Sequence, residues 1–194
     1  MLSVILCGGL STRMGSDKGM LPSDTSTWAQ SAADKMALLQ LPVVLSINNY
    51  QYNDYSTLFN PKQLINDDES LQVKGPLSGV LSVHLLYPTE DLFVLACDMP
   101  LMEAVILKEL YEYYLNNPGY QAYLFINDKE AEPLCAIYRK EGLSSIIEIH
   151  KKGNLVKHSM KFMLGLLSVY SIPVEENQKK YFRNINAHAE VNGL

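Results

Sequence analysis

The chain has 194 residues, the length of one domain of ordinary size that can bury a hydrophobic core. Hydrophobic residues make up 47% of the composition and charged residues 19%, which excludes a disordered or fibrous protein. The formal net charge of -5 argues against long nucleic acid as a partner, because that role needs many phosphate-neutralising Lys and Arg side chains. Any phosphate that is bound is therefore expected on a small molecule.

The cysteines and the N-terminus indicate a cytoplasmic protein. Cys7, Cys97 and Cys135 each lie in or next to an apolar run, and their spacing fits no zinc pattern, so we expect buried, reduced thiols. The apolar N-terminal run is short and follows no basic residues, unlike a secretory signal, and a lipoprotein cleavage site would need a small residue in place of Leu6. No stretch approaches the roughly twenty apolar residues that cross a bilayer, so no membrane partner is expected.

Short apolar runs that predict buried strands alternate with segments of helical periodicity. In chain order we expect a strand at 2–7, a helix at 26–41, strands at 43–47 and 63–66, a helix at 77–87, a strand at 92–97, a helix at 101–115, strands at 121–126 and 133–138, a helix at 140–150 and a last strand at 168–172. Pro42 is expected to stop the first helix, and the Asn-Asn-Pro-Gly sequence at 116–119 is expected to stop the helix at 101–115.

This alternation predicts an α/β fold with a mostly parallel central sheet and right-handed crossovers. Ligands of such sheets bind outside the carboxyl ends of the strands. Gly8, Ser46, Asp67 and Asp98 all fall at those expected ends, so we expect them near one another.

The first strand runs into a glycine-rich loop that reads CGGLSTRMGSDKG over 7–19. Gly8 and Gly9 permit a sharp turn and close backbone approach to a ligand, and successive N–H groups form a concave anion site. Arg13 and Lys18 add two positive charges, so the loop is suited to a polyphosphate. It has neither the Gly-Lys-Ser/Thr ending of a P-loop nor the G-x-G-x-x-G spacing of a dinucleotide fold.

The pattern Gly8-Gly9-x-Ser11-x-Arg13-Met14-Gly15-x-Asp17-Lys18 resembles the signature of the molybdenum cofactor guanylyltransferases, the molybdopterin-guanine dinucleotide biosynthesis protein A family. The resemblance implies a three-layer Rossmann-like nucleotidyltransferase fold. It implies one domain over 1–194, with the nucleotide bound by the N-terminal half and the acceptor by the C-terminal half. It places the backbone of Leu6, Gly8 and Gly9 near the nucleotide, and Arg13 and Lys18 on its phosphates.

Two further segments match the family in order. Gly75-Pro76-Leu77-Ser78-Gly79 resembles its G-P-L-x-G, which implies nucleoside contacts at Gly75 and Gly79, although a turn before a helix is the plainer reading of these residues. Cys97-Asp98-Met99-Pro100 resembles its C-D-x-P and implies that Asp98 holds Mg²⁺. A helix cap is the alternative role for Asp98.

Three more positions follow from the resemblance. Residues 182–186 resemble the family's F-x-N-x-N, which implies that Asn184 and Asn186 face the acceptor and the metal, although the Thr-Pro that usually follows is absent. Asp67 falls where relatives place an acid near the nucleotide. Glu132, in an E-P-L segment, either approaches the acceptor or is an ordinary exposed acid.

The implied reaction transfers GMP from GTP to molybdenum–molybdopterin and releases pyrophosphate, with Mg²⁺ as cofactor. Implied protein partners are the upstream molybdenum insertase and target molybdoenzymes or their chaperones. Cytidylyl transfer to the same acceptor and nucleotidyl transfer to a sugar phosphate remain alternatives. A non-enzymatic nucleotide-binding module would lack the metal carboxylate, so Asp98 argues against it.

Overall fold

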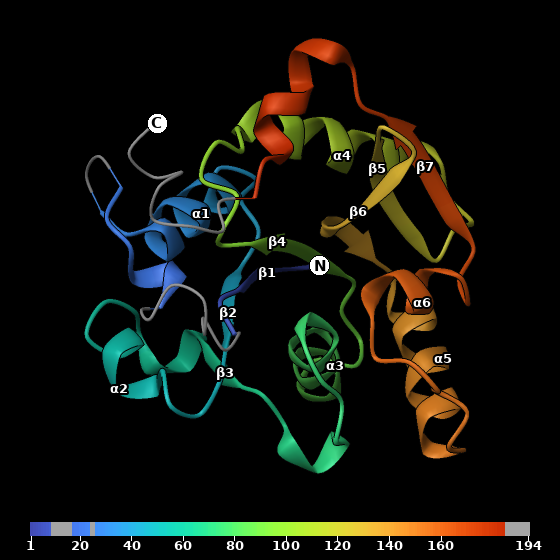
Figure 1. Cartoon of the computed structure of the whole chain (residues 1–194), viewed down its shortest axis with the longest axis horizontal. Coiled ribbons are helices and arrows are strands. Elements are labelled where there is room, and N and C mark those ends of the chain that lie inside the picture. The colour runs from blue at the N-terminus through green and yellow to red at the C-terminus, as the bar shows by residue number, and fades with distance from the viewer. Residues whose placement is uncertain (9–16, 24–25, 185–194) are drawn as a thin grey trace.

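Seven strands of the computed structural model form one sheet in the order β3-β2-β1-β4-β6-β5-β7, with helices on both of its faces (Figure 1). The structure describes residues 1–8, 17–23 and 26–184. The strands are β1 (Leu2–Leu6), β2 (Val43–Ile47), β3 (Leu64–Asn66), β4 (Leu92–Ala96), β5 (Ala122–Asn127), β6 (Glu130–Tyr138) and β7 (Val169–Pro173).

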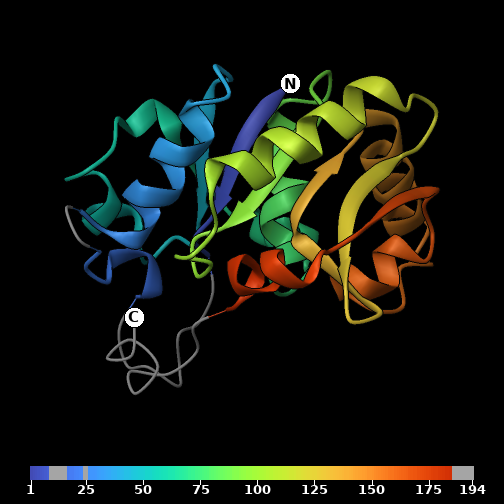
Figure 2. The ribbon, with the colours of Figure 1, turned by 90° about the horizontal axis from the view of Figure 1, so that it is seen from above.

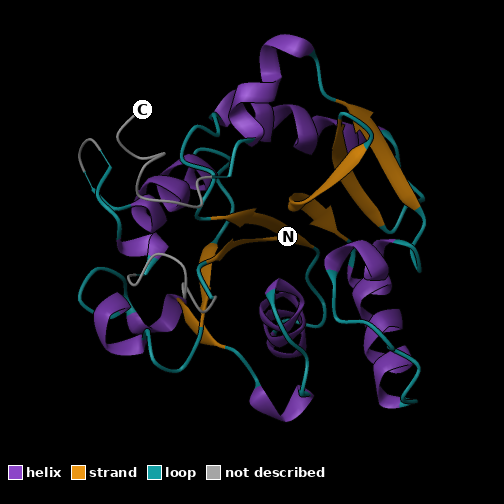
Figure 3. Cartoon of the chain, viewed as in Figure 1, coloured by secondary structure: helices purple, strands orange, loops and turns teal. Residues whose placement is uncertain are grey.

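Helices connect most of these strands (Figure 3). The α-helices are α1 (Trp28–Ala37), α2 (Tyr52–Tyr55), α3 (Pro76–Leu86), α4 (Ala104–Asn116), α5 (Lys140–Lys151) and α6 (Met160–Leu164). Short 3₁₀ helices are η1 (Lys18–Met20), η2 (Pro61–Gln63), η3 (Glu69–Leu71) and η4 (Glu176–Phe182). Within the described residues, no helix is both long enough and apolar enough to cross a membrane.

The sheet is mostly parallel, as predicted. β3, β2, β1 and β4 are parallel neighbours, and β5 pairs in parallel with β7. Only β6 runs the other way among these seven strands, because it pairs antiparallel with both β4 and β5. The carboxyl ends of β1, β2, β3 and β4 therefore share one edge of the sheet, where ligands of parallel sheets bind.

The core lies in two layers, one on each face of the sheet. Alternate residues of β1 point to opposite faces: Ile5 packs with α1 and α4, whereas Val4 and Leu6 pack with α3. Figures 1 and 2 show α1 and α4 on one face and α3, α5 and α6 on the other. Helices on both faces explain why the strands are continuously apolar rather than alternating.

The predicted elements are confirmed with shifts of a few residues, the largest at the helix ends. The first helix ends at Ala37, earlier than expected from Pro42, because Gln40 adopts a left-handed φ of 58° that no helix interior tolerates. The short helices α2 and α6 were not predicted, since four or five residues are too few to show a helical period.

Candidate active site

The expected residues at the carboxyl edge of β1, β2 and β3 do meet. Ser46 Oγ donates to Asp67 Oδ1 at 3.2 Å, and the N–H of Gly8 donates to the carbonyl of Ser46 at 3.1 Å. A Cβ added to Gly8 would lie 3.4 Å from Asp67 Oδ2, so the glycine faces this carboxylate directly. Burial raises the pKa of Asp67, and the hydrogen bond from Ser46 opposes that rise.

Lys18 and Asp98 form an ion pair at the same edge. Lys18 Nζ lies 2.9 Å from Asp98 Oδ2, and both side chains are one-fifth exposed. Lys18 lies in η1, at the end of the glycine-rich segment, and Asp98 follows β4, the strand beside β1. The helix-cap alternative for Asp98 is wrong: α4 begins only at Ala104, and its N-cap residue is Glu103.

The remaining oxygen of Asp98 suits a divalent cation. Asp98 Oδ1 is buried and has no hydrogen-bond partner among the described residues. No group of three His, Cys, Asp or Glu side chains in that part of the chain is placed to hold a metal ion. A single carboxylate fits Mg²⁺ nonetheless, because this ion is commonly bound by one or two carboxylates together with substrate phosphates and water.

The two glycines of the G-P-L-S-G segment have different surroundings. Gly75 is exposed, adopts φ 70° and has open space where a Cβ would lie, so it can face a ligand. Gly79 is buried, and a Cβ there would lie 2.2 Å from Ser46 Oγ and 3.3 Å from the Leu6 side chain. Gly79 is therefore needed for close packing of α3 on β1 and β2, and its contact with nucleotide stays a prediction.

The other predicted positions lie at the margins of the described chain. Gly9, Arg13 and Asn186 lie outside it. Asn184 is exposed and follows Phe182, which is buried and packs against Phe125 with ring centroids 5.1 Å apart and ring planes tilted by 60°. Phe182 belongs to the core layer on the α1 and α4 face, so Asn184 follows an anchored residue, and its approach to the carboxyl edge stays a prediction.

The three thiols are free and buried, as predicted. Cys7 and Cys97 extend β1 and β4, lie next to each other in that register and share a hydrogen bond between their side chains, which raises the pKa of Cys97 together with burial. The pKa of Cys135 is also raised by burial. Such thiols are poor nucleophiles, so the cysteines take a packing role.

Comparison with known proteins identifies the family. A family model described as the MobA-like NTP transferase domain matches residues 3–163. The chain belongs to this family.

Full-length relatives support that assignment. The chain is 27% identical to a probable molybdenum cofactor guanylyltransferase of Flavobacterium johnsoniae, over 98% of this chain and 94% of the relative. It is 27% identical to the molybdenum cofactor guanylyltransferase of Campylobacter jejuni, over 96% and 91%. The crystal structure of molybdopterin-guanine dinucleotide biosynthesis protein A from Archaeoglobus fulgidus shares the fold with a TM-score of 0.80 at 22% identity, covering 100% of this chain and 96% of that one.

Glu132 of this NTP transferase is not an ordinary exposed acid. It lies on β6, three residues before Cys135, which pairs with Leu95 near the end of β4; this places Glu132 at the carboxyl edge. Asn127 Nδ2 donates to Glu132 Oε1 at 3.1 Å, and burial raises the pKa of the carboxyl group. Asn127 Oδ1 is buried without a partner among the described residues.

Two residues that contact the glycine-rich segment at Asp17 carried no signal in the sequence. Tyr55 lies in the short helix α2 and Gln51 is the N-cap residue of that helix, and the side chains of both reach Asp17, beside Lys18. Their contacts span 34 and 38 positions in sequence, so no local pattern reveals them.

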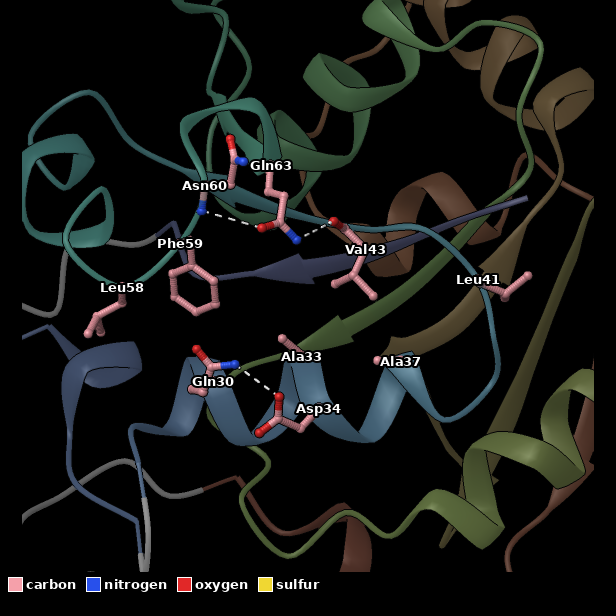
Figure 4. Close-up of a pocket in the computed structure, with 10 residues that line it drawn as sticks. All are labelled: Gln30, Ala33, Asp34, Ala37, Leu41, Val43, Leu58, Phe59, Asn60 and Gln63. Atoms are coloured by element: carbon pink, nitrogen blue, oxygen red, sulfur yellow. Dashed lines mark hydrogen bonds between the residues drawn. The ribbon is translucent and has the colours of Figure 1, made fainter.

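A separate pocket of about 380 Å³ lies between α1, the start of β2 and the segment before β3 (Figure 4). Its polar groups largely bond to one another: Gln30 donates to Asp34, and Gln63 bridges the N–H of Asn60 and the carbonyl of Val43. It contains none of the predicted site residues.

Proposed function

We propose that this protein transfers GMP from GTP to molybdenum–molybdopterin, with release of pyrophosphate. The observation that carries the proposal is the Lys18–Asp98 pair, 2.9 Å apart at the carboxyl edge of β1 and β4, with Asp98 Oδ1 left without a described partner. A cation and a free carboxylate oxygen beside a glycine-rich loop are the groups that a nucleoside triphosphate with its metal requires. The two relatives above supply the acceptor and the base, since both are named molybdenum cofactor guanylyltransferase.

The chemistry asks the protein mainly for positioning and charge stabilisation. The acceptor phosphate is already anionic, so its attack on the α-phosphorus of GTP needs no general base. The barrier arises from bringing two polyanions together and from charge that develops on the leaving pyrophosphate. Lys18 and Arg13 would stabilise that charge. Asp98 would hold Mg²⁺ beside the phosphates. The ion would screen the repulsion between the two polyanionic substrates.

The sheet suggests how the two substrates divide the domain. We place GTP on the N-terminal half, against Leu6, Gly8, Gly9, Asp67, Gly75 and Gly79, within a three-layer nucleotidyltransferase domain that spans 1–194. The acceptor would lie on the C-terminal half, near Asn184, Asn186 and Glu132. Support for this division comes from β6, which brings Glu132 to the edge where Lys18 and Asp98 lie, and from Phe182, which anchors the chain just before Asn184.

The first test is nucleotide choice. We expect calorimetric titration with GTP, CTP, ATP and UTP in the presence of Mg²⁺ to show a preference for GTP, and loaded molybdopterin to accept labelled GMP. A preference for CTP would move the protein to cytidylyl transfer, and a preference for UTP or ATP would favour a sugar-phosphate acceptor. No binding of any nucleotide would refute the proposal.

The second test removes the two charges. Asp98→Asn keeps the shape of the side chain and should lower kcat by about 10²-fold or more, because it removes a metal ligand. Lys18→Met should weaken GTP binding and slow transfer. Asp98→Asn should change the melting temperature little, because the neutral amide keeps the shape of the side chain, whereas Lys18→Met should lower it, because it leaves a largely buried carboxylate without its ion-pair partner. Parent rates in both variants would show that the site is misassigned.

A further inference from the structure

The carboxylate of Asp17, the residue before Lys18, is bound by three donors. Its Oδ1 accepts from the N–H of Gly19 at 2.9 Å and from the hydroxyl of Tyr55 at 3.2 Å. Its Oδ2 accepts from Gln51 Nε2 at 2.6 Å. Asp17 is thus fixed from inside its own turn and from α2.

Gln51 is itself held on three sides. Its Nε2 donates to the carbonyl of Cys7 at 2.9 Å as well as to Asp17, so both of its amide hydrogens have acceptors. Its Oε1 accepts from the N–H of Asn48 at 2.8 Å. The one side chain therefore ties the end of β1, the start of η1 and the turn after β2 together.

Tyr55 is fitted against the turn as well as bonded to it. Its side chain is fully buried, and a Cβ added to Gly19 would lie 2.0 Å from its hydroxyl oxygen. The backbone of η1 thus rests directly on the phenol. Burial raises the pKa of Tyr55 well above its usual range, so the phenol stays protonated and acts as a donor to Asp17.

These contacts fix the backbone on both sides of Lys18. Asp17 and Gly19 are each in contact with α2, and between them Lys18 sends its Nζ to Asp98 Oδ2. A lysine side chain has about 2 kcal/mol of rotamer entropy, so a fixed backbone narrows the positions that Nζ can reach. Gln51 and Tyr55 are buried, which prevents them from touching a substrate themselves.

We propose that Gln51 and Tyr55 are positioning residues, which hold Asp17 and Gly19 so that the Lys18 ammonium group is set against Asp98 for nucleotidyl transfer. The proposal rests on the function proposed above. It adds α2, a helix of four residues outside the glycine-rich loop, to the machinery of phosphate binding.

The test compares two buried tyrosines. Tyr55→Phe removes the donor to Asp17, and Gln51→Met removes the amide at nearly constant volume. Tyr123→Phe is the matched control. This phenol on β5 is also fully buried and donates to the carbonyl of Asn117, just after α4, at 2.7 Å. Among the described residues, no hydrogen bond or ring contact joins it to the loop.

We expect Tyr55→Phe and Gln51→Met to lower kcat about tenfold or more, because even a small misplacement of the Lys18 charge slows nucleotidyl transfer. The KM for GTP should change less, the stoichiometry of GTP binding should stay near one, and the melting temperature should fall no further than in Tyr123→Phe. Tyr123→Phe should keep the parent kcat.

A purely structural role predicts a different result. It would lower the fraction of active protein in proportion to lost stability and leave kcat per binding site unchanged, which would overturn the proposal. Crystal structures of the variants give a readout without turnover: Lys18 Nζ is expected to leave Asp98 in Tyr55→Phe and to stay in Tyr123→Phe. If the parent transfers no GMP, the proposed function fails, whereas an unmoved Lys18 in Tyr55→Phe refutes the positioning role alone.

Discussion

At the residue scale, the site holds charged groups that would be more stable in water. Asp67 is a half-buried carboxyl group beside Gly8, with one hydrogen bond from Ser46, and burial raises its pKa. Asp98 Oδ1 has no described partner. Such under-satisfied oxygens lower stability, and proteins keep them where a ligand makes use of them.

Asp67→Asn should stabilise the protein in a pH-dependent way. The folded-state pKa of Asp67 is raised above its unfolded-state pKa, near 3.8. Its contribution to the free energy of unfolding is therefore fully present below the unfolded-state pKa and is lost as pH rises through the folded-state pKa. The asparagine variant should therefore melt at a higher temperature at pH 7, and the difference should vanish towards pH 4. Thermal unfolding at intervals from pH 4 to pH 7 measures this.

The control is Asp54→Asn, at an exposed position. Its change in melting temperature measures the effect of losing one negative charge and is subtracted from the change in Asp67→Asn. Equal destabilisation of Asp67→Asn at every pH would mean that the Ser46 hydrogen bond, and not burial, dominates at this site.

At the element scale, α3 packs against the sheet through a glycine, Gly79. It is buried from Leu77 to His84, because it packs on β1, β2 and β4 with one side and contacts α5 with another. The close approach occurs at Gly79, where Ser46 Oγ fills the space of a side chain. The same contact places Ser46 to donate to Asp67, so the packing of the helix and the geometry of the site are coupled.

Gly79→Ala tests this coupling. An alanine usually stabilises a helix interior by about 1 kcal/mol relative to glycine. Here the added methyl group would meet Ser46 Oγ at 2.2 Å, and we expect a net loss of about 1–3 kcal/mol in urea unfolding. Combining it with Ser46→Ala should recover much of that loss, since the next contacts lie at 3.3 Å. Additive losses in the double variant would argue against a direct clash.

At the scale of the whole molecule, the segment after β7 packs back onto the face of the sheet that carries α1 and α4. β7 pairs with β5 at the far side of the sheet from β1. η4 then crosses back over the face that carries α4, where Gln178 donates to Glu109 of α4 at 2.9 Å and Phe182 packs on Phe125. These contacts anchor the chain up to Phe182 on that face of the sheet.

Phe182→Ala should separate acceptor use from nucleotide binding. Truncating this buried ring should cost about 3–5 kcal/mol of stability. It should also raise the KM for the molybdopterin acceptor, because Asn184 loses its anchor, while calorimetric GTP affinity stays within a factor of a few. Phe182→Leu, which fills much of the volume, should restore acceptor use. An equal loss of GTP affinity would place the C-terminal segment on the nucleotide instead.

The sequence predicted the elements better than the contacts between them. Strand ends at Cys7, Ile47 and Cys97 were located within one residue because buried strands are short apolar runs that end in polar or glycine residues. Such reasoning could not show that Asp98 does not cap α4, since this depends on where α4 begins. It also missed α2, which is too short to show a helical period.

The sequence by itself determined the α/β class, the mostly parallel sheet and the resemblance to the family, because each rests on local patterns of apolar residues, glycines and charges. Only the tertiary structure decided which side chains meet. Lys18 meets Asp98 across 80 positions, Tyr55 meets Asp17 across 38, and Gly79 accommodates Ser46. The physical reason is that a hydrogen bond, an ion pair or a steric fit depends on distances of a few ångströms, which chain folding creates between segments that share no local pattern.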